Sequence, residues 1–133
     1  MKTRLQLEAL PPSVNHIYRH TKRGTFKTAE YNTWANAVGY QVNRQMAGQP
    51  KWNEPVYVTL AMRRPRANCD VDNRLKGFGD LLQSHGVISN DKLIHGWNAF
   101  WSTSLPDGIA AEISITAADP SSLPDNSGRK VAA

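Results

Sequence analysis

The sequence is poor in the features that mark secreted, zinc-binding and membrane-spanning proteins. It has one cysteine, Cys69, among 133 residues, which excludes an intrachain disulfide and leaves no Cys-x-x-Cys pair for zinc. We interpret Cys69 as a packed, structural residue. No long apolar run follows Met1, so neither a secretory signal nor a membrane span is expected. These absences predict a soluble, cytoplasmic protein with no membrane partner.

Acidic residues are also few relative to basic ones. The chain has 16 Lys and Arg against 11 Asp and Glu, a formal net charge of +5. The basic residues gather in the first thirty positions and just before residue 70, at Lys2, Arg4, Arg19, Lys22, Arg23 and Lys27, and then at Arg63, Arg64 and Arg66. A polyanion is the natural partner of such a distribution.

Length and periodicity predict one α+β domain with a mixed four-stranded sheet and two main helices. A chain of 133 residues is long enough for one core but too short for two domains. Alternating apolar residues predict strands at 4–10, 54–62, 93–102 and 109–116, and spacings of three and four predict helices at 28–48 and 72–84. Residues 11–27 look like a loop-like arm, and residues 118–133 like a disordered tail after a domain at 1–117.

Aromatic residues and glycines within these elements have two interpretations each. Tyr31 and Trp34 lie on the apolar stripe of the first helix, which favours core packing over a platform for stacked bases. Trp97 and Trp101 lie four apart in a strand, which favours a core or dimer-interface role. Two glycines at positions 77 and 79 each cost the second helix about 1 kcal/mol. Close approach of another helix or of DNA would offset that cost.

Asp70 and Asp72, followed by Lys76 and later by Asp91, form the most informative group. Carboxylates two residues apart beside a lysine are what a site needs to hold a hard divalent cation against a phosphate. Spacing alone leaves an alternative, in which either aspartate caps the second helix and Asp72 forms an exposed ion pair with Lys76. The pattern points to phosphodiester chemistry, and the alternative stays open on these residues alone.

Two motifs resemble the RusA-type Holliday-junction resolvases, small dimeric endonucleases common in bacteriophages and prophages. The first is Asp70-x-Asp72-Asn73-x-x-Lys76, followed by Gly86-Val87-Ile88-x-Asn90-Asp91. The second is the opening Leu10-Pro11-Pro12-Ser13-Val14-Asn15. The likeness covers residues 1 to about 117 in order and spacing. It departs at Asn90, where the family often has a second acidic residue.

The resemblance implies an activity and a set of site residues. Asp70, Asp72 and Asp91 would be the catalytic, metal-binding carboxylates, and Lys76 would lie near the scissile phosphate. Mg²⁺ suits these oxygen ligands, with Mn²⁺ as a substitute. A homodimer with two-fold symmetry would cut four-way DNA junctions by paired nicks. The protein would then work in a bacterial host cell and could be encoded by a phage or prophage.

DNA contacts are expected from the arm, from the arginines before the carboxylates and from the motif asparagine. These residues are Asn15, Arg19, His20, Lys22, Arg23, Lys27, Arg63, Arg64, Arg66 and Asn73. His16 also suits a phosphate contact, whereas a zinc site of His16 and His20 would need a helix that the nearby prolines disfavour. The alternative function is a non-catalytic module that binds branched DNA through its basic surface. Cutting of branched DNA with and without EDTA distinguishes the two.

Overall fold

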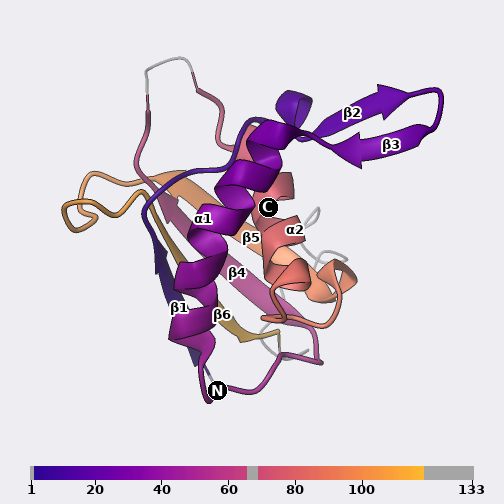
Figure 1. Cartoon of the computed structure of the whole chain (residues 1–133). Coiled ribbons are helices and arrows are strands. Elements are labelled where there is room, and N and C mark those ends of the chain that lie inside the picture. Colours follow the sequence, from indigo (N-terminus) through magenta and orange to yellow (C-terminus); the bar gives the residue numbers. More distant parts are fainter. Residues whose placement is uncertain (1, 66–68, 119–133) are drawn as a thin grey trace, which may run out of the picture.

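The computed structural model describes residues 2–65 and 69–118 of the chain. Figure 1 shows a sheet with two helices on one face and a hairpin that extends away from both. The strands of the sheet are β1 (Lys2–Leu7), β4 (Val56–Met62), β5 (Ile94–Trp101) and β6 (Ala111–Ala117), in the order β1-β6-β4-β5. Strand β6 pairs antiparallel with β1 and β4, whereas β5 pairs parallel with β4. The predicted mixed α+β fold is confirmed.

Helix α1 (Ala29–Met46) begins where the sequence predicts. The hydroxyl Oγ1 of Thr28 accepts a hydrogen bond from the Tyr31 amide at 3.1 Å, which satisfies one free donor of the first turn. Tyr31 is 4% exposed and Trp34 is 7% exposed. Both are therefore core residues, and the stacking-platform interpretation does not hold. The predicted stripe is buried at Tyr31, Trp34, Ala35, Val38, Val42 and Met46.

Helix α2 (Leu75–Ser84) follows a 3-10 turn, η2 (Asp72–Arg74), so the predicted helix starts with a tighter turn. Its Phe78 packs edge-on against Trp34 of α1, with ring centroids 5.7 Å apart. A Cβ at Gly77 would lie 2.6 Å from Cβ of Pro11. The close approach that offsets this glycine is therefore made by the N-terminal segment, not by a helix or DNA.

The core lies between the helices and one face of the sheet. Strand β4 alternates in the predicted way, with Val56, Val58, Leu60 and Met62 buried and the residues between them half-buried. The parallel register pairs Val58 with Trp97 and Met62 with Trp101. Because paired residues share a face, both tryptophans lie on the helix side, where they pack partly buried against the core.

The prediction of a loop throughout residues 11–27 was wrong. After the 3-10 turn η1 (Val14–His16), β2 (Tyr18–Thr21) and β3 (Gly24–Lys27) form a separate antiparallel hairpin. Only Tyr18 and Lys27, at its base, are half-buried, and the other strand residues are exposed. A hairpin exposed on both faces carries no apolar periodicity, so the usual strand signal was absent.

The remaining boundaries differ little from those expected. A third 3-10 turn, η3 (Asp91–Leu93), precedes β5. Ala118, the first residue of the predicted tail, is buried and donates its amide hydrogen to the carbonyl of Pro55 at 2.8 Å. The rest of that tail lies outside the described residues. Within the described ranges, no helix has the length and apolar character needed to cross a bilayer.

Candidate active site

A cavity of about 340 Å³ lies between α2, η3 and β5. Its lining residues are Asp72, Leu75, Lys76, Gly79, Asp91, Ile94 and Trp97. The structure thus brings Asp72, Lys76 and Asp91 together, which are three of the four residues predicted to be catalytic. The fourth, Asp70, is exposed in the loop before η2 and does not line this cavity.

Asp91 reaches the cavity because the chain reverses direction after α2. Gly86 has a φ of 71°, the left-handed conformation expected of the glycine that ends a helix. The Asp91 amide then donates to Oε1 of Gln83 at 2.8 Å, and Oδ1 of Asn90 accepts from the Lys92 amide at 2.8 Å. The first bond holds η3 beside α2, and the second closes the turn of η3 itself. In this arrangement Nζ of Lys76 lies 3.8 Å from Oδ2 of Asp91.

The helix-capping alternative for Asp70 and Asp72 is not found. The residues at the cap positions of η2 and α2 are Val71 and Arg74, and neither helix has a side-chain cap. Asp72 forms no ion pair with Lys76, because the 3-10 turn changes the spacing between them. Among the described residues, no side chain donates to the Asp72 carboxylate. That carboxylate is therefore available to a ligand in the cavity.

Lys76 pairs instead with Asp80, which the sequence analysis missed. The Lys76 Nζ to Asp80 Oδ1 distance is 3.1 Å, and the spacing of four residues on a helix was the available signal. The hydrogen bond to Asp80 raises the pKa of Lys76 above its ordinary value, against a smaller lowering effect of burial. Burial alone would raise the pKa of Asp80, but hydrogen bonds from Lys27, Tyr18 and Lys76 hold it below its ordinary value.

The cavity offers oxygen ligands for a divalent cation. In residues 2–65 and 69–118, no group of three or more His, Cys, Asp or Glu side chains is arranged to hold a metal ion. Asp72 and Asp91 nevertheless line the same cavity. This pair fits Mg²⁺, which in proteins takes one or two carboxylates and completes its octahedron with waters and phosphate oxygens.

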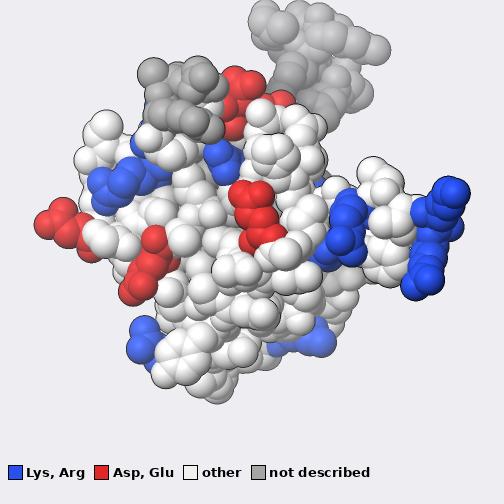
Figure 2. All heavy atoms as spheres, turned by 45° about the horizontal axis from the view of Figure 1, so that its top comes forward, with Lys and Arg blue, Asp and Glu red and all other residues white. Residues whose placement is uncertain are grey.

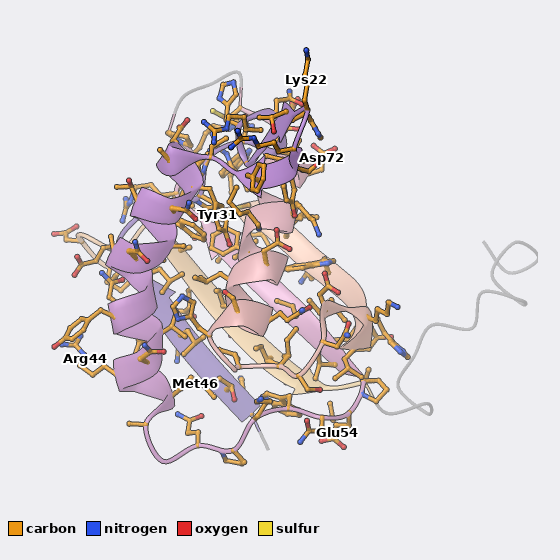
Figure 3. The ribbon with its side chains drawn as sticks, turned by 45° about the vertical axis from the view of Figure 1, so that its right-hand side comes forward. Lys22, Tyr31, Arg44, Met46, Glu54 and Asp72 are labelled. Carbon is orange, nitrogen blue, oxygen red and sulfur yellow. The ribbon has the colours of Figure 1, made fainter. Side chains whose placement is uncertain are left out.

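The predicted DNA contacts of the arm lie mainly on the hairpin. Figure 2 shows basic side chains gathered along this projection. Lys22, in the turn of the hairpin, lies at the same end of the molecule as Asp72, and Glu54 lies at the opposite end (Figure 3). Lys27 differs from the others because it is half-buried and bonded to Asp80. The predicted contacts of the arm that are exposed are Asn15, Arg19, His20, Lys22 and Arg23.

The other predicted contacts have varied surroundings. Arg63 donates hydrogen bonds to three backbone carbonyls of the β5–β6 loop at 2.9 to 3.3 Å, so its guanidinium has a structural role. The Arg64 guanidinium lies 5.5 Å from the ring centroid of Trp101. Asn73 is half-buried in η2. Arg66 lies outside the described residues.

Comparison with known proteins identifies the family. A family model described as Endodeoxyribonuclease RusA matches residues 9–116, most of the chain. The chain belongs to the RusA family. Over 92 residues it is also 32% identical to the crossover junction endodeoxyribonuclease RusA of Aquifex aeolicus (strain VF5), covering 68% of this chain and 72% of that relative. The resemblance drawn from the two motifs is confirmed, and RusA membership makes the chain an endonuclease that acts on DNA phosphodiester bonds.

Proposed function

We propose that this chain is a Mg²⁺-dependent endonuclease that resolves four-way DNA junctions by paired nicks on opposing strands. The observation that carries this function is the meeting of Asp72, Lys76 and Asp91 at one cavity of a RusA-family chain. The name of the Aquifex relative, a crossover junction endodeoxyribonuclease, supports the same substrate class.

Each residue at the cavity has a distinct role in this proposal. Asp72 and Asp91 hold the ion, and Asp70 supplies a further carboxylate from the adjacent loop. When bound, Mg²⁺ or Mn²⁺ supplies a water of lowered pKa and neutralises charge on the phosphate. Lys76 remains protonated, because its pKa is raised by Asp80, and its ammonium contacts a phosphate oxygen. Trp97 and Ile94 form part of the apolar wall of the cavity.

The hairpin supplies most of the affinity for the substrate. Arg19, Lys22 and Arg23 surround a hollow of about 480 Å³ on this projection, together with Phe26, which is 45% exposed. Cations beside an exposed aromatic ring suit a DNA backbone with accessible bases. A homodimer supplies two such surfaces and two cavities, and its two-fold symmetry matches that of a four-way junction.

The test compares cutting and binding by carboxamide variants. Asp70→Asn, Asp72→Asn and Asp91→Asn should each bind four-way DNA in gel-shift assays but not cut it in Mg²⁺, since an amide keeps the shape of the side chain and loses its charge. Asp107→Asn is the matched control, because Asp107 is exposed and does not line the cavity. It should cut as fast as wild type, and EDTA should stop wild-type cutting.

Several outcomes would contradict the proposal. A wild-type protein that binds junctions in Mg²⁺ without cutting any DNA would support the non-catalytic module. Full cutting by one of the three variants would remove that aspartate from the site. Sedimentation at micromolar concentration should give about twice the chain mass. A monomer that still makes paired nicks would contradict the dimer.

A further inference from the structure

Asp80 is bonded to three side chains that come from three different elements. Its Oδ2 accepts hydrogen bonds from Oη of Tyr18 on β2 at 2.8 Å and from Nζ of Lys27 on β3 at 2.5 Å. Its Oδ1 pairs with Nζ of Lys76 on α2 at 3.1 Å. The Asp80 side chain is only 13% exposed. These donors therefore replace most of the water that a free carboxylate would bind.

Two of these donors hold the base of the hairpin. Tyr18 and Lys27 are directly opposite each other in the β2–β3 register. Within the described ranges, β2 and β3 pair only with each other, and an isolated two-stranded hairpin is marginally stable in water. The Lys27 ammonium also lies 4.1 Å from the ring centroid of Tyr31 on α1. A single carboxylate thus joins both strands of the hairpin to α2.

The third donor lies at the cavity. The Lys76 ammonium is 3.1 Å from Asp80 and 3.8 Å from Asp91, so it is held between the two carboxylates. Asp80 itself does not line the cavity, and both of its oxygens are already bonded. It can therefore influence the cavity only through the groups that it holds.

We propose that Asp80 is a positioning residue that fixes the hairpin relative to the cavity and holds the Lys76 ammonium beside Asp91. This inference rests on the proposed function, because it gives Asp80 a role in presenting DNA that the hairpin has bound to the site that cuts it. Its two effects are separable. Anchoring of the hairpin depends on Tyr18 and Lys27, and the rate of cutting depends on Lys76.

Variants of the full chain separate the two effects. Asp80→Asn keeps the size of the side chain but loses the charge that attracts two ammonium groups. Tyr18→Phe removes one hydrogen bond to the hairpin and leaves the Asp80–Lys76 pair in place. Asp80→Glu keeps the charge and should recover part of each effect. Asp107→Asn, outside this network, should behave as wild type in both measurements.

Trypsin cleavage at Lys22 and Arg23 measures anchoring without any need for nuclease activity, because the tip must open to enter the protease. Asp80→Asn should raise the cleavage rate there by at least about threefold, and Tyr18→Phe by less. Single-turnover cutting of a saturating four-way junction should fall at least about tenfold in Asp80→Asn, since small misplacements of a reacting group are costly. In Tyr18→Phe it should stay within about twofold of wild type.

Wild-type trypsin sensitivity together with wild-type cutting in Asp80→Asn would overturn the proposal. A fall in cutting that Asp80→Glu does not relieve at all would overturn the role through Lys76. If Asp80→Asn does not fold, the double variant Tyr18→Phe/Lys27→Gln must still raise trypsin cleavage, and an unchanged rate would overturn the anchoring. If the wild type cuts no junction, the proposed function fails, while the trypsin comparison still tests the anchor.

Discussion

Replacing the two glycines of α2 by alanine should have opposite effects on stability. At Gly77 an added Cβ would lie 2.6 Å from Cβ and 3.0 Å from Cγ of Pro11. Pro11 is buried, and its carbonyl accepts a hydrogen bond from the Arg74 guanidinium. At Gly79 the nearest atom to an added Cβ is Cζ2 of Trp97 at 3.7 Å, an ordinary contact distance.

The expected magnitudes follow from these distances. Alanine in place of glycine stabilises a helix interior by about 1 kcal/mol. Gly79→Ala should gain up to that amount. Gly77→Ala should gain the same helix stabilisation but lose more through overpacking. The new methyl group would lie 0.8 Å inside the 3.4 Å limit of ordinary contact with the Pro11 ring, which cannot rotate away. Overpacking of this kind costs about 1 to 3 kcal/mol. The two variants should therefore differ by about 2 kcal/mol in free energy of unfolding, with Gly77→Ala the less stable.

Urea denaturation and calorimetry measure this difference directly. For a chain of this size, 2 kcal/mol corresponds to a gap of roughly 6 to 10 °C in Tm. The m-value should be unchanged in both variants, since neither alters the surface exposed on unfolding. If Gly77→Ala were as stable as Gly79→Ala, the segment at Pro11 would not pack against α2 as the structure shows, and the reason given for Gly77 would be refuted.

Three further predictions concern DNA affinity, acid stability and the core. The double variant Lys22→Ala/Arg23→Ala should lower the slope of log affinity against log salt by about 1 per lost phosphate contact. The control Lys51→Ala, at an exposed position after α1, should leave the slope unchanged. If the double variant and the wild type gave equal slopes in filter-binding titrations, the contact surface would lie elsewhere. Burial against Gly39 lowers the pKa of His85 below 6.5, so the unfolded chain binds a proton at this residue more readily than the folded chain does. The free energy of unfolding should therefore fall as the pH drops through 6.5 towards the folded-state pKa. His85→Gln should reduce this loss in urea titrations between about pH 7 and 5. Trp52 is fully buried, and its Nε1 donates a hydrogen bond to Oγ1 of Thr3 at 2.9 Å. Trp52→Phe should therefore lower the free energy of unfolding by about 2 to 3 kcal/mol. A value within about 0.5 kcal/mol of wild type in urea denaturation would contradict this role of the Trp52 side chain in the core.

Local patterns were sufficient to predict the elements that bury one face. The stripe of α1 depends on residues within a few positions of one another and is found as expected, and the Thr28 cap at its start is a local feature too. The alternation of β4 is equally local. The hairpin lacks such a pattern, because its strands pair with each other away from the core and only its base is half-buried. Its base is hydrogen-bonded to a residue more than fifty positions away, Asp80, which no local pattern reveals.

The site was predictable in its composition but not in its connections. Asp72, Lys76 and Asp91 stood out by residue type and spacing, the resemblance to the RusA family implied their roles, and the cavity brings them together. Lys76 has an aspartate four residues away on each side, Asp72 before it and Asp80 after it, and the sequence analysis considered only Asp72. The choice between them depends on the 3-10 turn that precedes α2, which periodicity of apolar residues does not reveal.

Helix α2 connects the hairpin to the cavity because neighbouring positions on it make contacts with different parts of the chain. Gly77 lies against Pro11 in the segment that leads into the hairpin, and Asp80 bonds both strands of that hairpin. Lys76 lines the cavity from the same turn as Gly77. A shift of α2 by a substituent at Gly77 would therefore move the anchor of the hairpin and the Lys76 ammonium together. For this reason Gly77→Ala should also slow junction cutting, whereas a loss confined to stability would mean that the hairpin and the cavity adjust independently of the helix.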